Sequence, residues 1–152
     1  MLRDSLDAVR SVMKEVRPEL NIYVNAVPED FVSPSFYVYP EPVREERLTK
    51  RIMRGVTVWH IHYFPKQLPS DIVDSFDQIE MSDLVRRAFS SRNFLRSPTR
   101  EVYTILSVVG GPEEDRSHIQ VSLEGQWLAT TSDPSANPEL MKEVHYKEEL
   151  SR

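Results

Sequence analysis

The residues most capable of chemistry are His60 and His62, which flank one isoleucine in the stretch GVTVWHIHYFPKQ at residues 55–67. The β-branched and aromatic residues around them predict a strand over residues 56–64. Side chains alternate along a strand, so both imidazoles share one face and lie about 7 Å apart. They are either part of a metal site or two side chains on the same face of a strand.

A metal site would need a third protein ligand, since a catalytic zinc takes about three protein ligands and an open position. His118, His145 or a carboxylate would have to supply it, and His118 lies in another predicted strand from which it could reach. No HExxH motif or spaced set of carboxylates accompanies them. We therefore expect no metal and no cofactor. A small metal-dependent hydrolase or nuclease that uses His60, His62 and His118 is the alternative from another functional class.

Other catalytic chemistries lack their residues. The chain has no cysteine, no GxSxG motif and no glycine-rich phosphate loop. The pair Gly110 and Gly111, followed by proline, is typical of a turn. The strand at residues 56–64 has no Glu-x-Lys, which metal-dependent nucleases of the PD-(D/E)xK type require. We expect a protein that is not an enzyme and has no catalytic residues.

The elements that position these residues follow from periodicity. An amphipathic helix is expected from Leu2 to Pro18, and a second helix from Ser70 or Asp71, with a kink or break near Met81–Ser82. The strands are predicted at residues 21–27, 35–39, 56–64, 102–109 and 117–129, the last two as a hairpin, and residues 90–100 are predicted to be a loop.

These elements predict the α+β class: one mixed or antiparallel sheet of about five strands, flanked by two main helices in the order α-β-β-β-α-β-β. We expect a single domain over residues 1–130. A C-terminal extension follows over residues 131–152, with a short helix that begins at Pro138.

Composition supports a single domain that does not bind nucleic acid strongly. The chain has 152 residues, with 24 acidic and 19 basic side chains and a net charge of -5. A strongly basic nucleic-acid-binding protein is therefore not expected. No stretch approaches about 20 consecutive apolar residues, so we expect no membrane partner and a soluble protein inside the cell.

A mixed-charge arm at residues 43–54 joins two of the predicted strands, and its alternating signs suit a solvated hairpin. Its charges could contact nucleic acid or a partner subunit. Aromatic residues near several prolines suit an interface as well as a core. The candidate interface residues are Arg44, Glu45, Glu46, Arg47, Lys50, Arg51 and Arg54 in the arm, and Phe36, Tyr37 and Tyr39 before it.

Three short motifs carry a resemblance to a known family. They are PSFYV at residues 34–38, followed by the arginine-rich arm; VWHIHYFP at residues 58–65; and PELM at residues 138–141. Together with the order of elements, they resemble the tail terminator family of long-tailed phages and prophages. The chain departs from that family's pattern where LTKRIM replaces a glycine-asparagine-like turn, and in the charges of SSRNFLRSPTR.

The resemblance implies a virion structural protein of the siphophage type. Such a protein caps the tail tube, ends its polymerisation and forms the interface for head attachment, as a homo-oligomeric ring that is generally a hexamer. The implied partners are further copies of itself, the tail tube protein and the head–tail connector or neck proteins, while DNA passes through the lumen without specific binding. The implied location is the head-proximal end of the tail, after assembly in the host cytoplasm.

Within that resemblance, we expect the arm and the PSFYVY segment to form the subunit or tube contacts, because an unpaired strand edge is a ready site for pairing. The closest alternative is another head–tail neck or completion protein, which would differ in its partner.

Overall fold

The computed structural model describes residues 1–129. The predicted C-terminal extension with its short helix, the PELM motif and His145 lie outside the described residues. The elements are α1 (Leu2–Val16), β1 (Asn21–Val24), β2 (Ser35–Pro40), β3 (Arg44–Arg47), β4 (Ile52–Phe64), α2 (Ser75–Ser90), β5 (Phe94–Arg96), β6 (Val102–Pro112) and β7 (Ser117–Leu128).

The strands form one mixed sheet in the order β1-β2-β4-β7-β6-β5, with β3 paired to the first half of β4. β1 and β2 are parallel, and the other pairs are antiparallel. The α+β class and the mixed sheet are confirmed. The prediction of about five strands in the order α-β-β-β-α-β-β was wrong, because the sheet has seven.

The two additional strands, β3 and β5, have only four and three residues, so neither is long enough to show the hydrophobic alternation that would predict a strand. β3 is the sequence REER and β5 is FLR, inside the segment predicted to be a loop. Each is held by backbone pairing to a longer neighbour, β4 or β6. The hydrogen bonds to these neighbouring strands, and not the local sequence, make the two segments extended.

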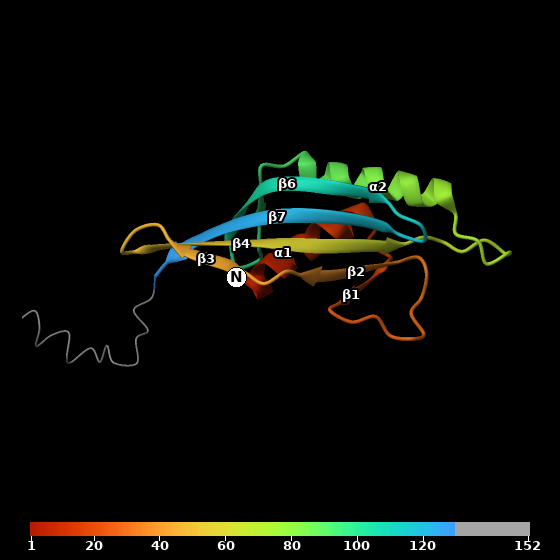
Figure 1. Ribbon diagram of the computed structural model, residues 1–152, viewed down its shortest axis with the longest axis horizontal. Coiled ribbons are helices and arrows are strands. Elements are labelled where there is room, and N and C mark those ends of the chain that lie inside the picture. The colour runs from red at the N-terminus through yellow and green to blue at the C-terminus, as the bar shows by residue number, and fades with distance from the viewer. Residues whose placement is uncertain (130–152) are drawn as a thin grey trace, which may run out of the picture.

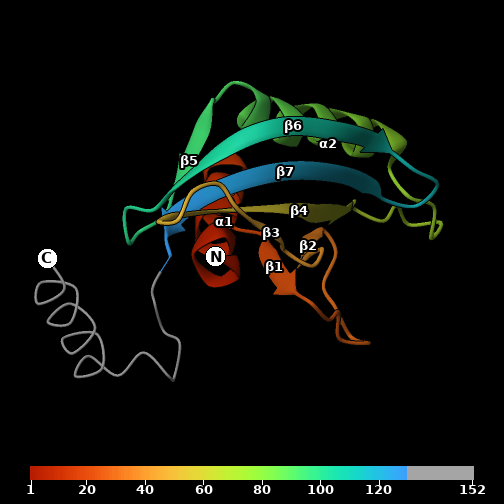
Figure 2. The same ribbon diagram turned by 60° about the vertical axis from the view of Figure 1, so that its left-hand side comes forward.

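Both helices pack against one face of a strongly curled sheet (Figure 1). Figure 2 shows the curl, which runs from β6 at the top through β7 and β4 to β2 and β1 at the bottom. The core lies between this face and the helices and includes Val9 and Met13 of α1, Val85 of α2, and Trp59 and Ile61 of β4. Neither helix within residues 1–129 is long and apolar enough to cross a membrane.

α1 has the extent that its pattern predicts, and it ends before Pro18. The buried residues recur at spacings of three and four, from Ser5 through Val9 to Val12 and Met13. Ser5 also accepts a hydrogen bond from the buried indole Nε1 of Trp59, at 3.1 Å. This contact ties the first turn of α1 to the middle of β4.

α2 is one continuous helix, so the predicted break near Met81–Ser82 was wrong, as was the predicted start at Ser70 or Asp71. Asp74 caps the helix by accepting hydrogen bonds from two backbone amides. The inward face carries polar residues: Gln78 Nε2 donates to the carbonyl oxygens of Glu113 and, at 2.6 Å, of Arg116.

This hydrogen bonding sets the rotation of α2. Gln78 and Ser82 face the turn between β6 and β7, where Ser82 Oγ donates to Ser117 Oγ at 2.6 Å. Phe76 and Ile79, which recur at helical spacing, are 86% and 51% exposed, whereas Val85 and Phe89 further along the helix are buried. The helix follows its buried hydrogen bonds, because unpaired polar groups in a core are costly.

The hairpin of β6 and β7 is confirmed, but the Gly110–Gly111 pair lies in β6 and does not form the turn, which spans Glu113 to Arg116. Gly110 has a φ of 146°, and a Cβ there would lie 2.1 Å from the carbonyl oxygen of His118. Only glycine permits this backbone conformation and this close approach to β7.

Candidate functional site

A cluster of imidazole and phenol rings occupies the face of the sheet opposite the helices. Trp59 and Ile61 of β4 point into the core, whereas His60 and His62 lie on the opposite face, as alternation predicts. Strand register places His118 of β7 beside His62, so the sheet brings the three histidines together. No helix of residues 1–129 covers this open face (Figure 2).

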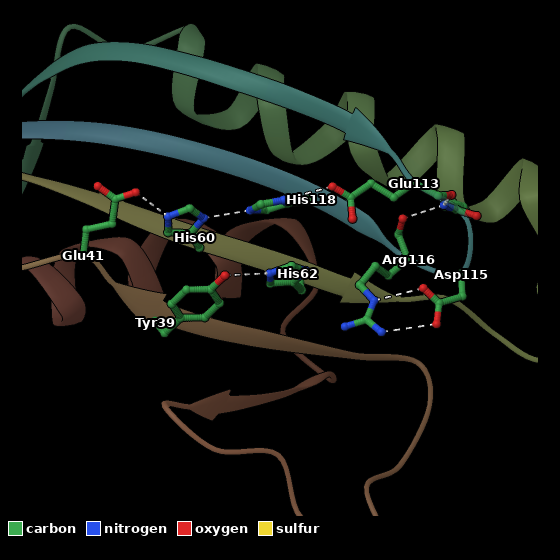
Figure 3. Close-up of polar contacts among 9 residues, drawn as sticks. Tyr39, Glu41, His60, His62, Glu113, Asp115, Arg116 and His118 are labelled. Atoms are coloured by element: carbon green, nitrogen blue, oxygen red, sulfur yellow. Dashed lines mark hydrogen bonds and ion pairs between the residues drawn. The ribbon is translucent and has the colours of Figure 1, made fainter.

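Two of the histidines form a hydrogen-bonded chain between two carboxylates (Figure 3). Glu41 Oε1 lies 2.8 Å from His60 Nε2, and His60 Nδ1 lies 2.8 Å from His118 Nε2. His118 Nδ1 then lies 3.1 Å from Glu113 Oε1. Both carboxylates accept, so satisfying all three contacts takes three protons on four ring nitrogens.

His62 lies beside this chain and is held mainly by stacking. Its ring stacks on His118 with centroids 4.2 Å apart, and its Nε2 lies 3.3 Å from the Tyr39 hydroxyl. Tyr39 in turn stacks on His60, with centroids 4.7 Å apart and an angle of 4°. These contacts leave His60 and His62 only 9% and 8% exposed, although no helix of the described part of the chain covers them.

Burial, which disfavours the charged form, lowers the pKa of His62 to about 4, with smaller contributions from the nearby His118 and Arg116. His62 is therefore neutral at pH 7. Its Nδ1 is buried and has no hydrogen-bond partner within residues 1–129.

The same geometry does not suit a metal centre. The lone pair of an imidazole nitrogen lies in the ring plane, and stacked rings direct their lone pairs along nearly parallel planes instead of to one point. The rings of His62 and His118 are only 14° apart, and both nitrogens of His60 and of His118 already have hydrogen-bond partners. Within residues 1–129, no group of three or more His, Cys, Asp or Glu could hold a metal ion.

The charged arm forms the hairpin of β3 and the start of β4, and it projects from one end of the sheet, at the left in Figure 1. All four residues of β3 are exposed, so the solvated hairpin is confirmed. Arg54 is held in place, because its guanidinium lies 2.8 Å from Glu46 Oε1 and 3.0 Å from Glu124 Oε1 of β7. The arm therefore has a fixed base and an exposed, charged outer strand.

The three aromatic candidates before the arm separate by face. Phe36 is 0% exposed and packs against the ring of Tyr63 in the core, so its side chain does not reach the surface. Tyr37 and Tyr39 lie on the open face beside His62 and His60. Their strand, β2, is not a free edge as expected, because β1 pairs with it in parallel.

The residues of the cluster differ in how far the sequence predicts them. Tyr39 shares its face with Tyr37 by simple alternation, which a sequence pattern can show. Glu41 follows the end of β2, and Glu113 and Arg116 lie in the β6–β7 turn, so none of them belongs to a periodic pattern. They reach the histidines only because β2 and β7 flank β4.

A comparison with protein families gives this architecture a family. The model of the family described as "Phage tail terminator protein" matches residues 4–93, more than half of the chain. The match runs from α1 through α2 and includes the PSFYV and VWHIHYFP motifs. No curated protein matches the chain. The family match carries the assignment: the chain belongs to the phage tail terminator family.

Proposed function

We propose that this protein ends the growth of the phage tail tube and provides the surface to which the head attaches. In this role it acts as a homo-oligomeric ring, generally a hexamer, at the head-proximal end of the tail. The observation that carries the proposal is the family match over residues 4–93. The family is a structural one, and the proposed work is shape complementarity without catalysis.

The one-sided packing of the helices supports a ring whose lumen is lined by the open face of the sheet. Helices on the outside would leave Tyr37, Tyr39 and the histidine cluster toward the lumen. The cluster carries the carboxylates Glu41 and Glu113, its Arg116 is paired with Asp115, and His62 adds no positive charge at pH 7. A lumen with this chemistry lets DNA pass without binding it, because phosphate binding needs basic side chains.

The arm is the proposed contact with the tail tube, the next subunit or the connector. Its outer strand is exposed and charged, and the Arg54 ion pairs hold its base against β7. Charged contacts set register and partner choice more than affinity, which suits a subunit that must recognise one end of a tube. The proposed contact residues are Arg44, Glu45, Glu46, Arg47, Lys50, Arg51 and Arg54, with Tyr37 and Tyr39 on the open face.

A capping assay tests the proposal. Purified tail tube protein is polymerised with and without this protein, and tube length is measured by electron microscopy while native mass spectrometry counts subunits. We expect a ring species and an arrest of tube growth. Reversing charge in the arm with Arg44→Glu, Arg47→Glu and Arg51→Glu should weaken capping at least tenfold.

The matched control is Arg3→Glu, Arg87→Glu and Arg100→Glu, which makes the same charge change at exposed arginines outside the arm. This control should cap normally. Tubes that grow to the same length with and without the unmodified protein would contradict the proposal. Binding to connector rings but not to tubes would favour the neck-protein alternative instead.

A further inference from the structure

Within residues 1–129, the sheet has two edges that lack a further strand: β1 on one side and part of β6 on the other. On its outer side β6 pairs only with β5, over Val102–Thr104, so residues 106–112 have no strand beside them within residues 1–129. At the opposite edge, β1 pairs only with β2 among the described residues. The register through β2, β4 and β7 places β1 and the free part of β6 at the same end of the sheet.

The edge strands at this end of the sheet, β1 and β6, are uncharged, whereas those at the other end, β3 and β5, lie in charged segments. β6 reads VYTILSVVGGP and β1 reads NIYV, and neither has a charged residue. At the other end, β3 reads REER and β5 lies within RNFLRSPTRE. Charged side chains on an edge strand are a common protection against pairing with another chain. The end with β3 and β5 has that protection, and the end with β1 and β6 lacks it.

Exposed apolar side chains flank the free edge of β6. Leu106 and Val109 are exposed on the strand itself. In α2, Asp77 faces β4, where it accepts a hydrogen bond from Tyr63 Oη at 2.6 Å. At about 100° per residue, Ile79 then lies on the opposite flank of the helix, the side beyond the edge of β6. Ile79 is also exposed.

Strand direction makes the two edges complementary in a ring. Counting across the sheet, β6 runs parallel to β4 and β1 runs antiparallel to it. A rotation about an axis along the strands preserves these directions, so β6 of one copy would meet β1 of the next in antiparallel orientation. The contact is heterologous, which is what a closed ring requires, and antiparallel pairing is the more stable kind.

We infer that the free edge of β6 pairs with β1 of a neighbouring copy of this chain, which continues the sheet from subunit to subunit. This inference rests on the proposed ring and names the backbone contact that closes it. Leu106 and Val109 would then be covered by the neighbour. Of the three contacts proposed for the charged arm, the tail tube and the connector would remain, because the next subunit would bind at the sheet edges.

The chain has no cysteine, so engineered cysteines report this contact directly. Asn21 of β1 and Val109 of β6 both lie on the open face and are exposed. The variant Asn21→Cys/Val109→Cys, treated with a short bis-maleimide under capping conditions, should give a ladder of covalent oligomers. Either single variant should give none.

The second experiment introduces a charge at the edge of β6 and measures ring assembly. Val109→Lys should raise the concentration at which the ring dissociates at least tenfold, with an unchanged circular dichroism spectrum. The control Leu128→Lys lies at the end of β7 away from this edge, at a residue that is 72% exposed against 61% for Val109. It should assemble normally.

The outcomes separate this inference from the proposed function. A ring that caps tubes, persists in Val109→Lys and gives no ladder overturns the edge pairing alone. Covalent dimers from the Val109→Cys single variant would overturn it in favour of symmetric pairing of two β6 strands. A protein that neither forms rings nor caps tubes overturns both.

Discussion

Over residues 59–62, the two faces of β4 are almost equally buried, but by different means. On the core face, two helices cover Trp59 and Ile61. On the open face, rings from the neighbouring strands stack on the histidines: Tyr39 on His60 and His118 on His62. Flat rings that stack across strands exclude water without a second layer. Alternation therefore predicts the face on which a side chain lies, but not how deeply it is buried.

The polar atoms on the two faces also differ in their hydrogen-bond partners. On the core face, the polar atoms of Trp59 and Tyr63 each have one partner in a helix, Ser5 and Asp77. On the open face, His60 and His118 contact each other and one carboxylate each, and His62 contacts the Tyr39 hydroxyl. We expect the core face to determine stability and the open face to determine how stability changes with pH.

The largest expected effect is on the core face. Ile61→Ala removes a fully buried side chain between the sheet and the helices and should lower the free energy of unfolding by about 3–4 kcal/mol. Chemical denaturation measures it. Val58→Ala, a truncation of a partly buried side chain on the open face that removes one carbon fewer, should cost about 1 kcal/mol or less. Equal losses at both positions would contradict the contrast between the faces.

The next effect is a pH dependence from His62. Its pKa is about 4 in the folded protein and 6.5 ordinarily, so between these values the unfolded chain binds a proton that the folded chain does not. Its contribution to stability is therefore complete above pH 6.5 and is lost as the pH falls toward 4. The loss amounts to about 2–3 kcal/mol.

The readout is the difference in pH slope between the unmodified protein and His62→Gln, because carboxylates also titrate in this range. Unfolding curves at pH 4.5, 5.5, 6.5 and 7.5 (roughly spanning that window) should show a shallower slope for the variant. Parallel curves would mean that His62 is as solvated in the folded chain as in the unfolded one.

The smallest effect concerns the Tyr39 hydroxyl. Tyr39→Phe removes its contact with His62 Nε2 but keeps the ring that stacks on His60. We expect a loss of about 0.5–1 kcal/mol, measured by thermal unfolding. Tyr39→Ala, which also removes the stack, should cost more. If both variants lose the same amount, stacking does not protect the open face.

Much of this fold follows from local patterns. α1, β2, β4 and the β6–β7 hairpin carry clear periodicity and form there, although β4 begins four residues earlier, at Ile52, and β6 continues three residues further, to Pro112. The rotation of α2 could not be predicted, because Gln78 and Ser82 face inward for partners that lie more than thirty residues away. β3 and β5 depend on backbone pairing and carry no pattern of their own.

The candidate site was predicted only in part, for a similar reason. Alternation places His60 and His62 on one face, and a neighbouring strand was expected to bring His118 within reach. The carboxylates at both ends of the hydrogen-bonded chain come from a strand end and a turn. Their positions depend on the order of strands in the sheet, which local sequence does not specify.

The ladder between β4 and β7 has a consequence for the order of folding. It pairs Ile52 with Leu128 and Tyr63 with Ser117, so it joins segments that are far apart in the chain. Loop closure of this length must precede the contacts that stabilise it, and such topologies fold slowly. During synthesis, β4 has no partner on this side until β7 has left the ribosome. The segment that matches the family, residues 4–93, therefore contains the central strand but cannot complete the sheet by itself.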